Sequence, residues 1–442
     1  MGDTTRGLQR STGRTNDNDD GGVTKMVLSK SAMAEWRGFW PLPIAAGLGY
    51  ATAVMYVYAM GPFIEPLARE FDWSRAQISS GITIAAFFSA IFCVPIGMLV
   101  DRIGPRRVGL VGVVLMCGAV ALLGTATGDE SNWIMLWGIL AFTTLWVQAT
   151  VWTSAVTSRF EASRGLALAI TLSGASVSAT VFPILATWLI GSYGWRTAFM
   201  AMSGAWLALV FPFLLLFFRG AHDQVSAHRT TASDTVRALA GVSLSEGIRS
   251  PALYKLIMAG GFFAFTAIGI VVHFVPILTD SGTEPLAAAG VASLVGIFSI
   301  IGRLGTGVLL DRYPGHLVGA IAFLIPIPAC ALLLFDGANP LSQSVAAAIF
   351  GLTLGSEVDV IAYLAARYFG LKNFGALYGA MVMALSLGVA FGPLGAGAVF
   401  DHYGSYAPFL VLTTVLMGVS ALALFSLRAT PTAEELTASA TT

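Results

Sequence analysis

The chain has 442 residues, of which 56% are hydrophobic and only 11% are charged, and its mean hydropathy is +0.77. Soluble domains carry about 25% charged residues, so the composition argues against a soluble enzyme and indicates a membrane protein. The 24 basic residues balance the 24 acidic ones, which gives no reason to expect nucleic acid as a partner. Cys93, Cys117 and Cys330 lie in separate apolar runs and indicate neither disulfides nor a metal site.

Apolar segments follow one another along most of the chain. Residues 1–37 have no apolar block, so we expect a disordered tail there. Twelve segments follow, each long enough to cross a bilayer as a helix of about 20 residues. They are 38–60, 77–100, 108–127, 133–156, 165–190, 197–218, 253–278, 286–310, 317–335, 343–366, 374–400 and 406–427. The short alternating segments of β-barrels are missing, so we predict an all-α membrane protein with twelve transmembrane helices.

Lysine and arginine are distributed unevenly between alternate loops. With the N-terminus inside, the inner segments hold 20 basic residues and the outer loops hold three, Arg69, Arg75 and Arg196. Basic residues favour the cytoplasmic side of a membrane. We therefore expect a multi-pass protein of the cytoplasmic (inner) membrane with both termini in the cytoplasm.

The second half of the chain repeats features of the first. Gly-Met-Leu-Val-Asp-Arg at 97–102 recurs as Gly-Val-Leu-Leu-Asp-Arg at 307–312, an offset of 210, and Tyr193-Gly194 recurs as Tyr403-Gly404 at the same offset. Two parallel six-helix halves, with a substrate path between them, are typical of alternating-access carriers. The expected parts are the tail 1–37, a bundle at 38–218, a cytoplasmic linker at 219–252, a second bundle at 253–427 and a cytoplasmic tail at 428–442.

The loop at 97–107 resembles the signature loop of the major facilitator superfamily, Gly-x-x-x-Asp-Arg-x-Gly-Arg-Arg, with Pro105 inserted before the arginine pair. Together with the twelve spans and the repeat, this resemblance covers about residues 38–427. It implies a pseudo-symmetric carrier fold. It also implies that the loop charges pair at helix ends to hold an inner gate shut. Those gating residues are Asp101, Arg102, Arg106, Arg107, Asp311 and Arg312.

Within the superfamily the chain is similar to the bacterial monocarboxylate and oxalate/formate branch. The similar features are Trp73-Ser-Arg75, Gly194-Trp195-Arg196, Arg303 in span eight, and Glu357-Val-Asp359 with Arg367-Tyr-Phe-Gly370 in span ten. Span one lacks the lysine of animal monocarboxylate carriers, and span eleven lacks the lysine of an oxalate/formate exchanger, which disfavours dicarboxylate exchange. Spans four and five lack the arginine and the Gly-Pro motif of drug/proton antiporters. This disfavours an exporter but leaves it as an alternative function.

Arg303 lies inside an apolar span, eight positions before Asp311 and therefore about 12 Å from that helix end. A charge at such depth costs at least about 2.5–3.5 kcal/mol and calls for a partner. Because a guanidinium stays charged and offers a planar fork that fits a carboxylate, we expect Arg303 to bind the carboxylate of the cargo. The alternative is a structural ion pair with a neighbouring helix.

Glu357 and Asp359 lie near the middle of span ten. Two residues apart on a helix, they point about 200° from each other, so one faces the path and the other packs against a neighbouring helix. A buried carboxylate beside an arginine can exchange a proton for an ion pair, which would couple transport to protons. The alternative is that both lock helix packing. No broken helix is evident in the sequence, which disfavours sodium as the coupling ion.

Four further polar or aromatic residues are candidates for the cargo path. They are His273 in span seven, Tyr50 in span one, and Gln148 and Trp152 in span four. Histidine titrates near neutrality and can relay a proton or bond a substrate, but it is more often a hydrogen-bonded packing residue. An amide such as Gln148 needs a partner in apolar surroundings, and the aromatic residues are more often core or lipid-facing.

The sequence therefore predicts a monomeric secondary transporter, not an enzyme, that needs no cofactor. Its cargo would be a small organic acid, most simply a monocarboxylate, with either an aliphatic or an aromatic tail. The proton would be its coupling ion. An exporter of drugs or metabolites is the alternative within the same class. A transport-inactive membrane sensor or a membrane-embedded enzyme is the alternative outside it.

Overall fold

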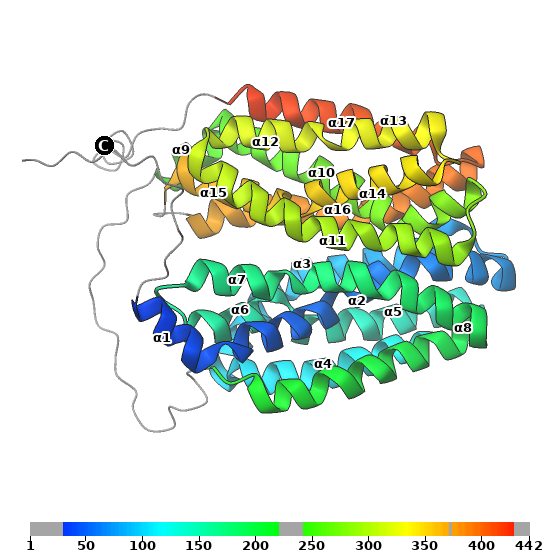
Figure 1. Cartoon of the computed structure of the whole chain (residues 1–442), viewed down its shortest axis with the longest axis horizontal. Coiled ribbons are helices and arrows are strands. Elements are labelled where there is room, and N and C mark those ends of the chain that lie inside the picture. Colours follow the sequence, from blue (N-terminus) through cyan, green and yellow to red (C-terminus); the bar gives the residue numbers. More distant parts are fainter. Residues whose placement is uncertain (1–29, 221–241, 371–373, 428–442) are drawn as a thin grey trace, which may run out of the picture.

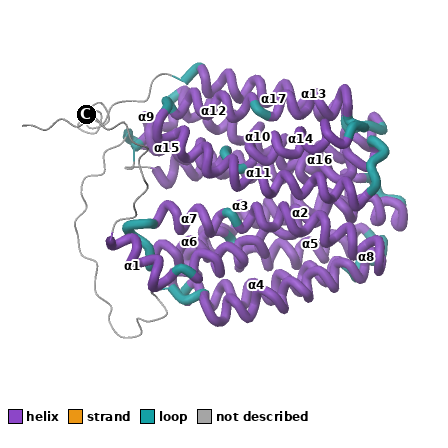
Figure 2. Tube along the Cα trace, in the orientation of Figure 1, coloured by secondary structure: helices purple, strands orange, loops and turns teal. Residues whose placement is uncertain are grey.

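The computed structural model describes residues 30–220, 242–370 and 374–427, and nearly all of these are helical. The helices are α1 (Lys30–Phe39), α2 (Pro41–Phe71), α3 (Arg75–Ile103), α4 (Pro105–Leu123), α5 (Glu130–Thr144), η1 (Leu145–Val147), α6 (Ala149–Thr157), α7 (Arg164–Leu172), α8 (Gly174–Phe217), α9 (Leu244–Arg249), α10 (Pro251–Asp280), α11 (Pro285–Arg312), α12 (Gly315–Leu324), α13 (Pro326–Asp336), α14 (Pro340–Leu354), α15 (Glu357–Phe369), α16 (Phe374–Tyr403) and α17 (Ala407–Phe425). Figure 2 shows them as long rods joined by short loops.

The described helices account for the twelve predicted membrane crossings. Eleven helical stretches are long and apolar enough to cross a membrane, and one of them runs from 164 to 217. Its larger part, α8, has 44 residues and would be about 66 Å long if it were straight, twice the apolar thickness of a bilayer. Gly194 interrupts α8 with φ 78° and ψ 161°, a conformation open to glycine. This stretch therefore crosses twice, which confirms the predicted number.

The helices form two bundles that repeat one another. The starts of α2 and α10 (41 and 251), α3 and α11 (75 and 285), and α5 and α14 (130 and 340) are each separated by 210 residues, as the sequence repeat predicts. Figure 1 shows the two bundles stacked side by side. In the described chain most contact between them comes from three helix pairs: α2 with α10, α3 with α16, and α8 with α11.

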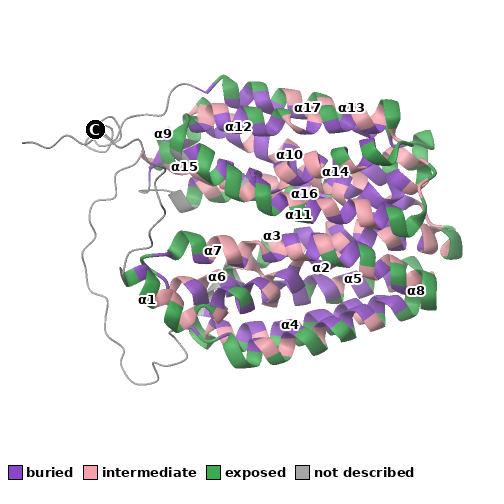
Figure 3. Cartoon of the chain, viewed as in Figure 1, coloured by how far each residue is buried: buried purple, intermediate pink, exposed green. Residues whose placement is uncertain are grey.

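The two ends of this molecule differ. The helices α1 and α9 lie at one end, where the described chain also begins and finishes (Figure 1); we call it the α1 end. Because α2 runs away from α1, the turn between α2 and α3 lies at the opposite end, which we call the Arg75 end. Buried residues lie along the contacts within and between the bundles, and exposed residues lie on the outside (Figure 3). Many of the exposed residues are large and apolar.

Glycines allow the backbones of α11 and α14 to approach closely. A Cβ atom on Gly302 would lie 2.0 Å from the carbonyl oxygen of Leu352, and one on Gly355 would lie 2.0 Å from the carbonyl oxygen of Ser299. Small residues at helix contacts are a main source of packing in membranes, where lipid is as apolar as the side chains. This close approach brings the middle of α11, including Arg303, next to the start of α15.

Four of the predicted spans are interrupted in the described chain. Spans five and nine divide at Ser173 and Ile325, where φ and ψ stay helical. Span four breaks at Gln148, whose φ of −59° and ψ of 158° are extended, so α5, η1 and α6 share one crossing. Span ten turns at 355–356, between α14 and α15. The expectation of unbroken helices is wrong, because tertiary packing determines where these helices end. Since broken helices are present, they give no reason to disfavour sodium as the coupling ion.

The sequence analysis places residues 30–37 in a disordered tail. In the structure they form most of α1. Glu35 accepts hydrogen bonds from the backbone N–H groups of Glu161 (3.0 Å), Ala162 (2.9 Å) and Ser163 (3.1 Å) and from the Ser163 hydroxyl (2.8 Å). Trp36 packs against Phe160, with ring centroids 5.1 Å apart. These contacts join α1 to the loop that leads into α7. Residues 1–29 lie outside the described part.

We expect the close contact of α11 with α14 to limit the size of residue 302. Gly302→Ala would press a methyl group against the Leu352 carbonyl, and overpacking of this kind costs about 1–3 kcal/mol. The melting temperature of the purified protein in detergent should fall. A Cβ atom on Gly305, on the same helix, meets nothing within 4 Å, so Gly305→Ala is the matched control and should not lower it. Equal melting temperatures for the two variants would contradict this account.

We expect the docking of α1 to weaken in acid. The hydrogen bond from the Ala162 N–H, helped by those from Ser163 and Glu161, lowers the pKa of Glu35 from 4.5 to about 2 against the opposing effect of desolvation. Docking is therefore at full strength above pH 4.5 and is lost as the pH falls towards 2. A nitroxide at Met33→Cys, an exposed position, should gain mobility over that range. With Glu35→Gln it should be mobile already at neutral pH; a rigid label in that variant would contradict the prediction.

Candidate functional site

Arg303 lies in the middle of α11 with its guanidinium only partly paired. Its Nε atom is 3.6 Å from Oδ2 of Asp359 on α15, and its side chain is 16% exposed. Its Nε and Nη1 atoms are buried and have no hydrogen-bond partner among the described residues. A separation of 3.6 Å is an ion pair but not a hydrogen bond. The fork of donors is therefore available to a further anion.

The two carboxylates of span ten begin α15 rather than continuing a straight helix. Glu357 and Asp359 occupy the first turn of α15, where the positive end of the helix dipole favours negative charge. Asp359 reaches Arg303 and is 34% exposed. Glu357 is buried, and its Oε1 has no hydrogen-bond partner in the described chain. The two side chains thus differ in surroundings, as their 200° separation predicts.

Two tyrosines of the first bundle lie near this site. Tyr50 and Tyr58 of α2 lie near Arg303, and Tyr58 also lies near Glu357. Since α2 and α11 belong to different bundles, the group lies at the junction between the halves. We call Arg303, Glu357, Asp359, Tyr50 and Tyr58 the Arg303 cluster. Tyr50 is one of the path residues that the sequence predicts. Tyr378 of α16, which lies near both carboxylates, is not among them.

Three predicted path residues are not in this cluster. The Gln148 amide donates to the hydroxyl of Ser89 at 3.0 Å, which supplies the partner that its position requires. Trp152 is fully buried, donates its indole N–H to the Val147 carbonyl and packs over Gly49. Trp152 is therefore a packing residue in this structure, and its contact with cargo stays a prediction. His273 lies towards the Arg75 end.

The predicted gating charges lie at the α1 end. Arg102, Arg107 and Arg312 are exposed, and Arg106 donates to the Leu215 carbonyl of its own bundle at 2.8 Å. The side chains of Asp101 and Asp311 lie outside the described residues. Within the described part, no ion pair joins the two bundles at this end. The expected role in shutting an inner gate stays a prediction for a state that closes here.

The opposite end is closed by a network around Arg75, which we call the Arg75 clasp. The Arg75 guanidinium pairs with both oxygens of Asp280 at 2.8 and 3.1 Å. It also donates to the Tyr406 hydroxyl at 2.8 Å and to Glu65 at 3.3 Å, and it lies 3.6 Å from the centre of the Phe400 ring. Because Arg75 belongs to the first bundle and Asp280 to the second, the clasp joins the halves.

Asp401 of α16 adds a backbone contact to the clasp. Its two oxygens accept hydrogen bonds from the N–H groups of Arg75 and Ala76, both at 2.9 Å. These are unpaired donors of the first turn of α3, and the positive end of the helix dipole favours a carboxylate there. Gly397 permits the approach, since a Cβ atom on it would lie 2.7 Å from the Ala76 nitrogen. One bundle thus caps a helix of the other.

The sequence analysis missed the clasp, although the repeat carried a signal for it. Glu70 pairs with Arg196 inside the first bundle. The offset of 210 maps this pair onto Asp280 and Tyr406, so the second bundle has the carboxylate but no cation at the matching position. Arg75 fills that role from the other half. In the sequence, Arg75 stands out only as an outer-loop charge and as part of the motif Trp73-Ser-Arg75.

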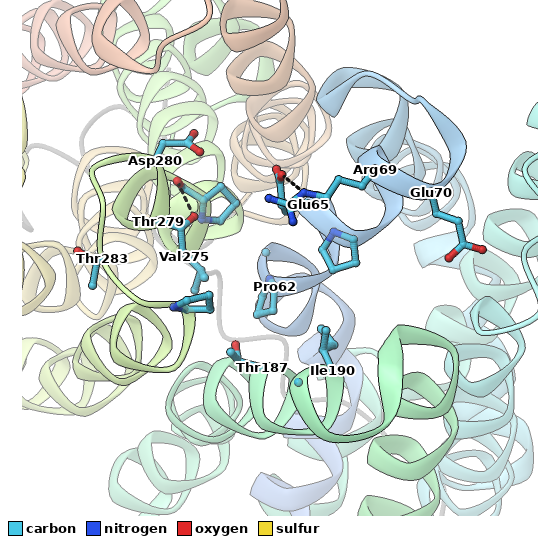
Figure 4. Close-up of a pocket in the computed structure, with 15 residues that line it drawn as sticks. Pro62, Glu65, Arg69, Glu70, Thr187, Ile190, Val275, Thr279, Asp280 and Thr283 are labelled. Atoms are coloured by element: carbon cyan, nitrogen blue, oxygen red, sulfur yellow. Dashed lines mark hydrogen bonds and ion pairs between the residues drawn. The ribbon is translucent and has the colours of Figure 1, made fainter.

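A pocket of about 680 Å³ opens beside the clasp. Pro62 and Glu65 of α2, Thr187 of α8, and Val275 and Asp280 of α10 line it, and Figure 4 shows these side chains around the opening. The pocket lies at the Arg75 end and does not include the Arg303 cluster.

Comparison with known proteins is consistent with this architecture. The family model described as Major Facilitator Superfamily matches residues 46–381. Monocarboxylate transporter 13 of Rattus norvegicus is 28% identical over 391 residues, covering 86% of this chain and 87% of that protein. A chloramphenicol resistance protein of Streptomyces lividans is 26% identical over 357 residues, covering 79% and 87%.

A solved structure shares the fold. The crystal structure of a bacterial homolog of the human lysosomal transporter Spinster superposes with a TM-score of 0.68 at 17% sequence identity. The match covers 87% of this chain and 95% of that chain. The superfamily and the fold expected from the sequence are therefore confirmed.

We expect Arg75→Ala to open the Arg75 end. The variant would lose the ion pair with Asp280, which is only partly buried, together with the contacts to Tyr406 and Glu65. Spin labels at Asp129→Cys and Ala338→Cys, exposed loop positions in the two bundles at this end, report the separation in nanodiscs. The separation should lengthen in the variant. Arg69→Ala is the control. Arg69 is 79% exposed, and among the described residues its ion pair is with Glu65, four residues away, so the variant keeps the pair of Arg75 with Asp280. Identical distances for both variants would refute the clasp.

Proposed function

This chain belongs to the Major Facilitator Superfamily, and from that premise we propose that it is a secondary transporter of a small organic anion, most simply a monocarboxylate. Cargo would bind at the Arg303 cluster, between the two halves, and transport would proceed by alternating access. The proposal includes symport with protons and import across the cytoplasmic membrane. The protein would act as a carrier and catalyse no reaction on its cargo.

One observation carries the proposal of an anionic cargo. Arg303 holds a charge inside the membrane region, its single ion pair is 3.6 Å long, and two of its nitrogens have no hydrogen-bond partner among the described residues. A guanidinium in an apolar environment that lacks full pairing favours an incoming carboxylate, which can accept two parallel hydrogen bonds. The name of the monocarboxylate transporter that the chain resembles supports the same class of cargo.

The neighbouring carboxylates support proton coupling. Asp359 competes with a cargo carboxylate for Arg303, since both would bind the same fork. Protonation of Asp359 would release Arg303 to the cargo and would remove an uncompensated negative charge from the site. Glu357, buried and unpaired at Oε1 in the described chain, is the second candidate for the proton. Tyr50 and Tyr58 would contact the rest of the cargo from the first bundle.

The clasp supports an assignment of the two sides. With both termini in the cytoplasm, as the distribution of basic residues predicts, the Arg75 end faces outward. The structure would then represent a carrier closed to the outside. The gate loops at 97–107 and 307–312 would meet at the α1 end when the carrier closes to the cytoplasm. The chain would work as a monomer, because the path runs between its own halves.

An exporter is the alternative candidate. The similarity to a chloramphenicol resistance protein at 26% identity favours it. Such a carrier would exchange its cargo for protons and would not need an anion at Arg303. The direction of the proton gradient that drives transport separates the two functions.

We expect proteoliposomes that contain the protein to take up a radiolabelled monocarboxylate when the proton gradient is directed inward. Arg303→Ala should weaken cargo binding by about ten- to hundredfold, because a hydrogen bond to a charged group contributes about 1.5–3 kcal/mol. Arg303→Lys should restore the charge but not the fork, and so should recover only part of the affinity. Asp359→Asn should uncouple uptake from the proton gradient while exchange of labelled for unlabelled cargo continues.

Arg367→Ala is the matched control, since Arg367 is an exposed arginine on the same helix as Asp359. Its uptake should equal that of the wild type. Uptake that does not depend on Arg303 would make this arginine a structural ion pair and would refute the anionic cargo. Transport only against an opposite gradient would favour the exporter.

A further inference from the structure

His273 of α10 is fully buried and connects the interior of the protein to the Arg75 clasp. Its Nδ1 lies 2.7 Å from the hydroxyl of Tyr406, which in turn accepts a hydrogen bond from Arg75 at 2.8 Å. Its Nε2 lies 3.0 Å from the carbonyl oxygen of Pro393 and 3.1 Å from the hydroxyl of Ser79. The imidazole therefore contacts both halves of the molecule, since Ser79 belongs to α3 and Pro393 to α16.

These contacts determine where the protons are. A carbonyl oxygen only accepts, so Nε2 of His273 carries a hydrogen and donates it to Pro393. In the neutral imidazole Nδ1 is then an acceptor, and the Tyr406 hydroxyl donates to it. The Tyr406 oxygen is left to accept from Arg75. The neutral form of His273 therefore supplies the donor that the Pro393 carbonyl needs and the acceptor that the Tyr406 hydroxyl needs.

A protonated His273 does not fit this arrangement. Its Nδ1–H would face the Tyr406 hydroxyl, whose own hydrogen would lose its acceptor inside the closed end. It would also add a second buried cation close to Arg75. The other charged groups here are Asp280, Glu65 and Asp401, and their carboxylates bind the Arg75 side chain or the backbone at the start of α3. Among the described residues none of these three carboxylates hydrogen-bonds to His273.

We propose that His273 is a positioning residue of the Arg75 clasp: its neutral form holds the Tyr406 hydroxyl against Arg75, and its protonated form keeps the clasp from closing. This inference rests on the alternating access in the proposed function. It does not depend on the cargo or on the proton at Glu357 or Asp359. It gives His273 a role in closing the Arg75 end instead of in binding cargo.

The direction of the pH effect follows from the order of events. When the Arg75 end is open, water reaches His273, and an exposed histidine titrates near pH 6.5. Closure requires the proton to leave. The closed form therefore predominates above that pH, and the ratio of closed to open forms falls about tenfold for each pH unit below it. Acid on the side of the clasp would hold the carrier open to that side.

The experiment measures the distance between nitroxides at Asp129→Cys and Ala338→Cys by pulsed electron resonance in nanodiscs, with Cys93, Cys117 and Cys330 replaced by Ala. The pH is varied from 8 to 5. With His273 present, the population with the longer distance should rise as the pH falls below about 6.5, the pH at which an exposed histidine begins to be mostly protonated. With His273→Gln, which keeps a donor for Pro393 but does not titrate, the population should be the same at every pH.

Two further variants complete the test. His402 is an exposed histidine in the last turn of α16, at the Arg75 end. His402→Gln should therefore give the same pH response as the wild type. His273→Asn serves if the glutamine variant does not fold, and it should also abolish the response. A pH response that persists in the His273 variants, or a wild type without one, overturns the proposal. If the distance responds as expected but no organic acid is transported, the proposed cargo fails and the role of His273 stands.

Discussion

The need to pair each charge that lies in an apolar environment governs this structure. Two arginines differ in how completely their charge is paired. Arg75 has a bidentate partner in Asp280, further contacts with Glu65 and Tyr406, and an aromatic ring at 3.6 Å. Arg303 has one ion pair of 3.6 Å and two nitrogens without a hydrogen-bond partner among the described residues. The first arginine is committed to structure, and the second is available to bind.

This contrast arises from a departure from internal symmetry. The two halves repeat at 210 residues, and a strict repeat would give each half its own carboxylate and arginine at the ends of equivalent helices. The first half has this pair in Glu70 and Arg196. The second half has Asp280 but carries Tyr406 where the cation would be. Asp280 must therefore take its cation from the other half. Where the first half has a contact within one bundle, the second half has a contact between bundles.

Close helix approach supports both sites. Gly302 and Gly355 bring α11 against α14 and set Arg303 beside Asp359, while Gly397 lets α16 reach the start of α3. In lipid, where apolar side chains gain little by leaving their surroundings, such contacts carry much of the packing. The same glycines that stabilise the bundles thus determine which charged groups meet.

The sequence by itself determined the membrane class, the twelve spans and the repeat, and it showed that Arg303 and the acidic residues of span ten lie inside apolar spans. These features depend on local hydropathy, on spacing along a helix and on the cost of a buried charge. Only the tertiary structure decided that Trp152 packs in a core, that α1 docks through Glu35, and that Arg75 closes one end. Each of these depends on partners more than 100 residues away in the chain, such as Glu35 with Ser163 or Arg75 with Asp280. Local periodicity shows which face of a helix is apolar, but it carries no information about which distant group that face will meet.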